Sequence, residues 1–135
     1  MKDRPFFDTN VVLYAFRQDD PRSQLAESLL AAGGIVSVQV LNEFVAVARR
    51  KLGKSWEEVG RALAILRVLC PEPVSISIDT HERALQIAVR YGYSIYDSLV
   101  IAAALNANAS TLYSEDMQDG QVIEGLTIRN PFPGS

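Results

Sequence analysis

The chain has 135 residues, of which 48% are hydrophobic and 21% are charged, and its net charge is −3. This composition excludes a disordered chain and predicts one domain, residues 1–135, that buries roughly two thirds of its unfolded surface. The negative charge gives no general attraction to nucleic acid or to acidic membranes, so a polyanionic partner would need a local basic patch or a bound cation.

The cysteine count and the hydropathy pattern exclude further classes of protein. The single cysteine, Cys70, excludes an internal disulfide framework and an all-thiolate zinc site. No apolar run approaches the ~20 residues that span a bilayer, and the N-terminus lacks the layout of a signal peptide. We therefore expect a cytoplasmic protein with no membrane partner, and an irregular tail from about residue 131.

Strand-like and helical segments alternate along the chain. Short apolar runs predict strands at residues 5–8, 35–37, 74–76, 110–114 and 126–129. Capping residues followed by apolar residues at helical spacing predict helices that begin at about Asn10, Asp20, Ser37, Ser55, Asp79 and Ser94. The alternation predicts an α/β fold, with a central parallel sheet of four to five strands and helices on both faces.

Some acidic residues have a structural explanation. Asp20 precedes Pro21, which is the pattern of an N-cap before a proline at the first helical position. Asp79 and Glu82 have the spacing of a capping box. Carboxylates in these positions satisfy backbone N–H groups, so we exclude Asp20, Asp79 and Glu82 from the candidate site.

Other acids lie where parallel strands end. Asp8 is at the carboxyl end of the first strand, the edge where open α/β sheets build ligand sites. Glu115, Asp116 and Asp119 follow the strand at 110–114, and that acidic loop must be exposed or neutralised by a cation. Carboxylates that converge without a His or Cys cluster favour Mg²⁺ or Mn²⁺ over Zn²⁺.

Two further acids are ambiguous on pattern alone. Asp97 opens the most apolar helix, where a buried charge needs a partner, but it also has capping-box spacing to Ser94. Glu43 lies at the border of an apolar helical stripe, and a solvated position on the flank of the helix is equally compatible. For both residues the structural and the functional interpretation stay open at this point.

One basic cluster could bind phosphate. Arg49, Arg50 and Lys51 end the helix that carries Glu43, and Lys54 follows. Arg50 is the best single candidate because it is seven residues from Glu43 and therefore on the same side of the helix. Favourable positive charge at a helix C-terminus explains the cluster equally well.

Four segments in order resemble PIN-domain ribonucleases, and in size and layout the VapC-type toxins of bacterial toxin–antitoxin pairs. They are Asp8-Thr9-Asn10 after an apolar strand, VLNEF around Glu43, YDSLVIAAAL around Asp97 and LYSEDMQDG around Asp116. The resemblance covers the chain from Phe6 to about Asn130 and implies the three-layer α/β/α fold of that family.

The resemblance also implies roles for individual residues. The implied catalytic acids are Asp8, Glu43, Asp97 and Asp116. Asp8, Asp97 and Asp116 would hold one or two Mg²⁺ or Mn²⁺ ions, with support from Asn10, Ser114 and Asp119. The implied reaction is hydrolysis of RNA phosphodiester bonds to 5′-phosphate and 3′-hydroxyl ends. The implied partners are a VapB-like antitoxin that inserts an arginine into the acidic site, and a second copy of the chain in a homodimer.

Two other classes of function remain as alternatives. A phosphatase or phosphoryl-transfer domain would use Asp8 as nucleophile, but it requires a second Asp where Asn10 stands, and no lysine follows Lys54. The second alternative is a non-catalytic interaction module with a PIN-like fold. The complete set of acids favours an active enzyme that is reversibly inhibited.

Overall fold

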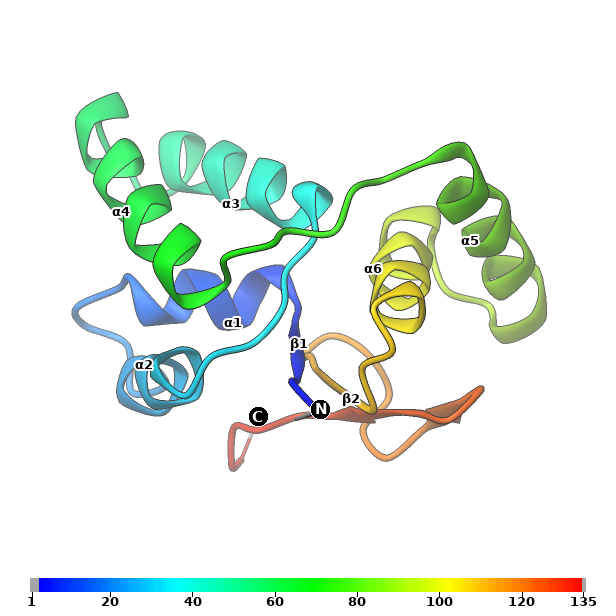
Figure 1. The fold of residues 1–135 in the computed structure, drawn as a ribbon. Helices are drawn as coiled ribbons and strands as arrows, with labels where there is room; N and C mark the ends of the chain where they lie inside the picture. Colours follow the sequence, from blue (N-terminus) through cyan, green and yellow to red (C-terminus); the bar gives the residue numbers. More distant parts are fainter. Residues whose placement is uncertain (1–2, 135) are drawn as a thin grey trace.

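The computed structural model describes residues 3–134, which form six helices and four strands (Figure 1). In chain order these are β1 (Phe6–Phe7), α1 (Thr9–Ala15), α2 (Ser23–Ala31), α3 (Val38–Arg50), α4 (Trp56–Leu69), α5 (Ile78–Tyr91), α6 (Ile95–Asn106), β2 (Thr111–Tyr113), β3 (Val122–Ile123) and β4 (Leu126–Arg129). In Figure 1, α1 to α4 gather on one side of β1, and α5 and α6 lie on the other. The predicted α/β fold is confirmed.

The sheet has the strand order β1-β2-β4-β3. The first two pairs in this order are parallel, as predicted, and β3 pairs antiparallel with β4. The sequence pattern does not predict β3. Its turn to β4 consists of Glu124 and Gly125, which both have positive φ, and two-residue hairpin turns require this backbone conformation.

The expected strands at 35–37 and 74–76 are wrong. In each segment the sheet-like pairing is reduced to isolated bridges, Ile35 with Phe6 and Ser37 with Val74. A backbone hydrogen bond still joins these two segments: Val74 N donates to Val36 O at 2.9 Å. The pairing is too short for a strand because Ser37 immediately caps the next helix.

Serine caps confirm three of the predicted helix starts. Ser37 accepts a hydrogen bond from Val40 N, Ser55 forms a capping box with Glu58, and Ser94 accepts from Asp97 N. Such caps satisfy N–H groups that have no partner inside the helix.

Two predicted acidic caps are wrong. The helix after Asp20 begins only at Ser23, because the Asp20 carboxylate accepts from the backbone and side chain of Arg22. The capping box at the start of α5 consists of Ser77 and Thr80, so the helix begins at Ile78 and Asp79 lies within its first turn. The Ser77 hydroxyl is already in place to bind the Thr80 N–H, so the predicted Asp79–Glu82 box does not form.

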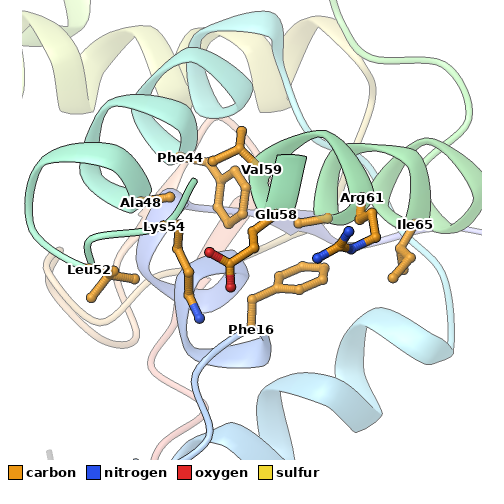
Figure 2. Close-up of a pocket in the computed structure, with 10 residues that line it drawn as sticks. Phe16, Phe44, Ala48, Leu52, Lys54, Glu58, Val59, Arg61 and Ile65 are labelled. Carbon is orange, nitrogen blue, oxygen red and sulfur yellow. The ribbon is translucent and has the colours of Figure 1, made fainter. Parts of the chain in front are cut away.

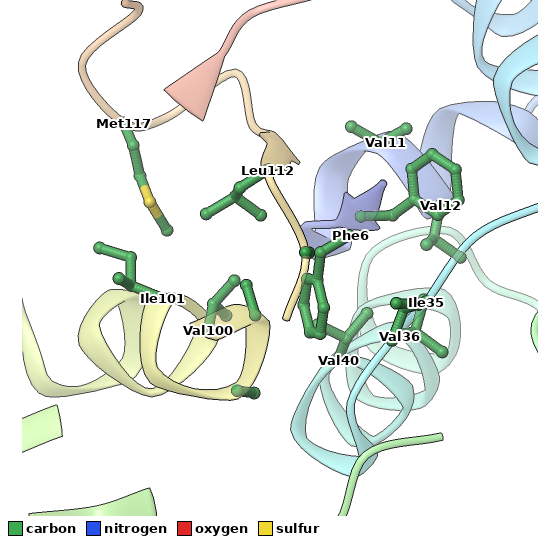
Figure 3. Close-up of a cluster of buried hydrophobic side chains, with 14 of the residues drawn as sticks. Phe6, Val11, Val12, Ile35, Val36, Val40, Val100, Ile101, Leu112 and Met117 are labelled. Carbon is green, nitrogen blue, oxygen red and sulfur yellow. The ribbon is translucent and has the colours of Figure 1, made fainter. Parts of the chain in front are cut away.

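Helix α6 runs through the middle of the core, as its composition predicts. Its residues from Ser98 to Ala104 are all buried. Figure 3 shows Val100 and Ile101 of α6 beside Leu112 of β2 and Met117. Burial of a helix on all sides fixes its N-terminus, and therefore Asp97, relative to the sheet. Within residues 3–134, no helix combines the length and the apolar character needed to cross a membrane.

Candidate functional site

The carboxyl ends of β1 and β2 bring Asp8 and Ser114 together. Phe7 pairs with Tyr113 in the parallel register, and Asp8 N donates to Tyr113 O at 3.0 Å. The next residue on each strand continues that register. Ser114 Oγ therefore donates to Asp8 Oδ2 at 2.8 Å, while Thr9 N donates to Oδ1 at 2.7 Å. Both oxygens of the Asp8 carboxylate are held in place.

A cavity of about 510 Å³ opens at this edge of the sheet. We call it the acidic pocket because its lining includes Asp8, Glu43, Asp97 and Asp116. These are the four acids predicted as catalytic, and they come from four separate segments of the chain. Arg17 and Lys51 also line the cavity. None of the four carboxylates takes part in an ion pair within the described residues 3–134.

Glu43 reaches the pocket from the second turn of α3. Its Oε1 accepts a hydrogen bond of 2.9 Å from Thr9 Oγ1. The sequence analysis did not assign a role to Thr9. Its signal was weak, because a threonine after a helix N-cap is common and only the tertiary fold shows that its hydroxyl faces Glu43.

Asp116 is tied to the first helix and to the end of β2. Asn10 Nδ2 donates to Asp116 Oδ2, and Asp116 N donates to Ser114 Oγ at 3.2 Å. Ser114 therefore connects the Asp116 backbone with the Asp8 carboxylate. Of the three residues predicted to support the acids, Asn10 and Ser114 contact them directly.

Burial and nearby negative charges raise the pKa values of Asp8, Asp97 and Asp116. Burial, with a smaller contribution from the charges of Asp97 and Asp116, raises the pKa of Asp8 to about 6, although the hydrogen bonds from Ser114 and Thr9 oppose the change. Burial and then Asp116 raise the pKa of Asp97, and burial and then Glu115 raise that of Asp116. None of these three carboxylates forms an ion pair within residues 3–134, so a cation bound beside them would lower their pKa values.

The donor set suits a hard divalent cation. Carboxylate, amide and hydroxyl oxygens surround the pocket, and Mg²⁺ prefers such ligands. Within residues 3–134 no three Asp, Glu, His or Cys side chains already lie close enough together to hold one ion. Mg²⁺ keeps several waters and is commonly bound through one or two carboxylates, so the arrangement fits a partly hydrated ion.

Four residues of the predicted site do not line the acidic pocket: the buried Ser114, which contacts two of the acids, and Asp119, Arg49 and Arg50. Asp119 accepts a hydrogen bond from Asn130 N at 2.8 Å and so fixes the segment after β4. Arg49 donates to Lys54 O and lies over the Trp56 ring, and Arg50 is exposed and absent from the pocket lining. Of the predicted phosphate contacts, only Lys51 lines the pocket.

A second network holds the residue next to Asp116. Arg22 Nη1 donates to Glu115 Oε2 at 2.8 Å, and the Tyr14 hydroxyl donates to Glu115 Oε1. The Arg22 guanidinium also binds Asp20 and lies 3.9 Å from the centre of the Tyr14 ring. Burial and the Glu115 hydrogen bond raise the pKa of Tyr14 to about 12, so its hydroxyl stays a donor. We call this set of four residues the Arg22 clamp.

An apolar groove lies beside α3 and α4 (Figure 2). Its volume is about 210 Å³, and Phe16, Phe44, Val59 and Ile65 contribute to its lining. Ile65 is 51% exposed, which is unusual for a large aliphatic side chain.

Residues 6–118 match the PIN domain family, and the chain belongs to this family. VapC20 of Mycobacterium tuberculosis, a toxin that cleaves the sarcin-ricin loop, has a similar fold with a TM-score of 0.70 and 24% identity, over 83% of this chain and 89% of that one. A toxin–antitoxin complex from Klebsiella pneumoniae gives a TM-score of 0.73 and 21% identity, over 95% and 98% of the two chains.

VapBC2 from Rickettsia felis, solved with a DNA fragment of its promoter, gives a TM-score of 0.67 and 22% identity, over 93% of this chain and 97% of that one. No curated protein sequence matches the chain significantly. At these identities the solved structures establish the shared fold.

Proposed function

We propose that the protein is a Mg²⁺- or Mn²⁺-dependent endoribonuclease and the toxin of a type II toxin–antitoxin pair. The observation that carries this proposal is the convergence of Asp8, Glu43, Asp97 and Asp116 on one pocket without a neutralising ion pair within residues 3–134. Asp8 is buried and three further carboxylates share its pocket, so their negative charge favours a counter-charge, which a divalent cation would provide.

Different residues of the pocket would bind the cation and orient its ligands. Asp8, Asp97 and Asp116 would hold the cation, and Ser114 and Asn10 orient two of these carboxylates through hydrogen bonds. When bound, the cation would polarise the scissile phosphate and increase the acidity of a water molecule.

Glu43 is the proton acceptor in this proposal. It lies in the same pocket, and Thr9 orients it by donating a hydrogen bond to Oε1. Thr9 does not bind Oε2, which is therefore the oxygen proposed to accept the proton. A carboxylate in this position can accept a proton from the attacking water as a general base.

Cleavage of an RNA panel with Mg²⁺, Mn²⁺ or EDTA tests the proposal. We expect Asp8→Asn and Asp97→Asn to lower the cleavage rate on the order of 100-fold. Glu72→Gln is the matched control, because Glu72 is an exposed acid that lies outside the pocket. Equal cleavage by the wild type and both Asn variants, or full activity in EDTA, would refute the assignment.

We also propose a VapB-like antitoxin as partner, supported by the toxin–antitoxin complexes that share this fold. The apolar groove of Figure 2 is the best candidate surface for such a protein, because large apolar side chains are accessible there. Homodimerisation is a further proposal, which light scattering of the purified chain would test.

Where a short reading frame adjoins this gene, co-expression with its product tests the partner assignment. We expect that protein to suppress RNA cleavage, and Ile65→Asp in the groove to relieve the suppression. Val68→Asp is the control, since Val68 is on the same helix and 78% exposed but outside the groove. Equal effects of the two substitutions would place the partner elsewhere.

A further inference from the structure

A basic cavity adjoins the acidic pocket. It has a volume of about 420 Å³, and its lining consists of Arg17, Gln18, Asp19, Lys51, Leu52 and Lys54. We call it the basic pocket. Arg17, Lys51 and Leu52 line both cavities, so the two cavities are adjacent. Three basic side chains against the one carboxylate of Asp19 give the basic pocket the opposite charge to its neighbour.

We propose that the basic pocket binds an RNA phosphate next to the one that is cleaved, and that Arg17, Lys51 and Lys54 hold it. This assignment rests on the proposed ribonuclease function and adds to it the path of the substrate. Of the sequence-based basic cluster it keeps Lys51 and Lys54, and it replaces Arg49 and Arg50 with Arg17.

The three basic side chains are available to a ligand. Neither Lys51 nor Lys54 forms an ion pair with any residue between 3 and 134. Arg17 lies 3.9 Å from Asp20 Oδ2, but that carboxylate already accepts three hydrogen bonds from Arg22. A phosphate would therefore meet cations whose charge is only weakly compensated.

The loop that carries the two lysines is fixed before any ligand binds. Lys54 N donates to Ala48 O at 3.0 Å, and Arg49 Nη1 donates to Lys54 O at 2.9 Å. Arg49 is itself held over the ring of Trp56, at 4.5 Å from its centre. Gly53, with φ of +64°, allows the turn between the two lysines. A site whose backbone is already ordered loses less entropy on binding.

The lining indicates recognition of the RNA backbone. Gln18, Leu52 and the charged residues line the cavity, and its lining within residues 3–134 contains no aromatic ring on which a base could stack. Contacts to phosphate position a nucleic acid and carry no sequence information. An RNA strand with one phosphate among the acids also needs compensation for the adjacent phosphates, and the basic pocket is where the strand would leave the acidic pocket.

Salt-dependent binding of a fluorescent RNA tests this inference. Anisotropy is measured in the Asp97→Asn background, which removes a proposed metal ligand and thus limits cleavage, and Arg17→Gln, Lys51→Gln and Lys54→Gln are compared. We expect each to weaken binding about two- to fivefold, equally for unrelated RNA sequences. Each should also reduce the slope of log K against log salt by about 0.7. Lys51→Arg should retain the wild-type slope.

Arg90→Gln provides the matched control, because Arg90 is an exposed residue of α5 and lines neither pocket. Unchanged affinity and slope in all three pocket variants would overturn the inference, and so would a larger loss in Arg50→Gln than in Lys51→Gln. Binding of an acidic peptide with the same dependence on these residues, without RNA binding, would show that the pocket serves a protein partner instead. RNA binding that depends on the pocket, together with no cleavage by the wild type, would support the phosphate site and refute the nuclease function.

Discussion

Ser114 Oγ donates a 2.8 Å hydrogen bond to Asp8 Oδ2, although the two residues are 106 positions apart in the chain. Ser114 is fully buried, and its oxygen also accepts from Asp116 N. One hydroxyl group therefore fixes the acid at the end of β1 relative to the acid that follows β2. The parallel pairing of Phe7 with Tyr113 places Asp8 and Ser114 next to each other at the sheet edge.

Removing this hydroxyl tests its contribution. Ser114→Ala leaves one oxygen of a buried carboxylate and the Asp116 N–H without their partner, so we expect a loss of about 1–3 kcal/mol in the free energy of unfolding. The same change should raise the pKa of Asp8 further, because the Ser114 hydrogen bond lowers it. Urea denaturation and NMR titration of the Asp8 carboxyl measure the two effects.

Ser98→Ala is the matched comparison for Ser114→Ala. Ser98 is equally buried, but its hydroxyl has no hydrogen-bond partner within residues 3–134. Losing an unsatisfied polar group is neutral or favourable, so stability should be unchanged or should increase slightly. If both variants are destabilised equally, the Ser114–Asp8 bond has no special contribution.

The stability of the metal-free protein should fall as the pH rises from about 4 to about 6. The pKa of Asp8 is raised from 3.8 to about 6 in the folded state, so in this range the unfolded chain releases a proton that the folded chain keeps. The stabilisation from the protonated Asp8 carboxyl is therefore fully present below pH 3.8, its pKa in the unfolded chain, and is lost above about pH 6, its pKa in the folded protein. Its full size is about 3 kcal/mol, and the raised pKa values of Asp97 and Asp116 act in the same direction.

Asp8→Asn isolates this contribution. The difference in unfolding free energy between the variant and the wild type should change with pH over the same window and favour the variant at pH 7. Guanidinium unfolding in EDTA at several pH values measures this difference. The other carboxylates are present in both proteins, so their contributions to the pH dependence cancel. A difference that does not depend on pH would contradict the raised pKa of Asp8.

A local signal points to Asp8, because an aspartate directly after a buried strand marks the sheet edge. For Glu43 and Asp97 the local pattern leaves a structural role open, and only the resemblance to PIN domains assigns them to the site. Thr9 and Arg17 could not be found in this way. Thr9 acts through its hydrogen bond to Glu43, and Arg17 acts because it lines the two cavities. Both roles depend on residues far away in the chain, so no local sequence pattern marks them.

The errors at helix starts have a related cause. Asp20 looks like an N-cap, but the guanidinium of Arg22 competes for the same carboxylate. At α5 the Asp79–Glu82 spacing is the standard signature, whereas the observed box uses Thr80 opposite Ser77, which is a weaker sequence signal. Where two caps compete within a few residues, side-chain partners decide between them.

Two glycines offer a test of the packing around β1. A Cβ on Gly34 would lie 2.3 Å from Phe7 Cε2 and 2.7 Å from Pro5 O, so Gly34→Ala must displace the strand that carries Asp8. We expect a loss of about 1–3 kcal/mol in unfolding free energy. A Cβ on Gly60 in α4 meets nothing within 4 Å, and Gly60→Ala should stabilise by roughly 0.5–1 kcal/mol. Thermal and urea unfolding of the two variants measure these changes. If both substitutions stabilise the protein, or both destabilise it, the expected difference in packing is wrong.

The ion pair between Arg22 and Glu115 should influence the activity of the acidic pocket, although neither residue lines it. Arg22→Gln removes the cation that binds Glu115, whose charge already raises the pKa of the adjacent Asp116. We expect roughly tenfold slower cleavage, the size typical of residues that orient metal ligands, with little change in the KM for RNA. Tyr14→Phe should have a smaller effect, because Glu115 keeps its bond to Arg22.

A double-mutant cycle separates the charge of Glu115 from a general loss of structure. Glu115→Gln removes the repulsion, so the double variant Arg22→Gln/Glu115→Gln should recover most of the cleavage rate that Arg22→Gln alone loses. Arg83→Gln is the control, because Arg83 forms a comparable ion pair with Glu124 away from the pocket and should leave cleavage unchanged. If the double variant is as slow as Arg22→Gln, the clamp acts through folding and not through the charge beside Asp116.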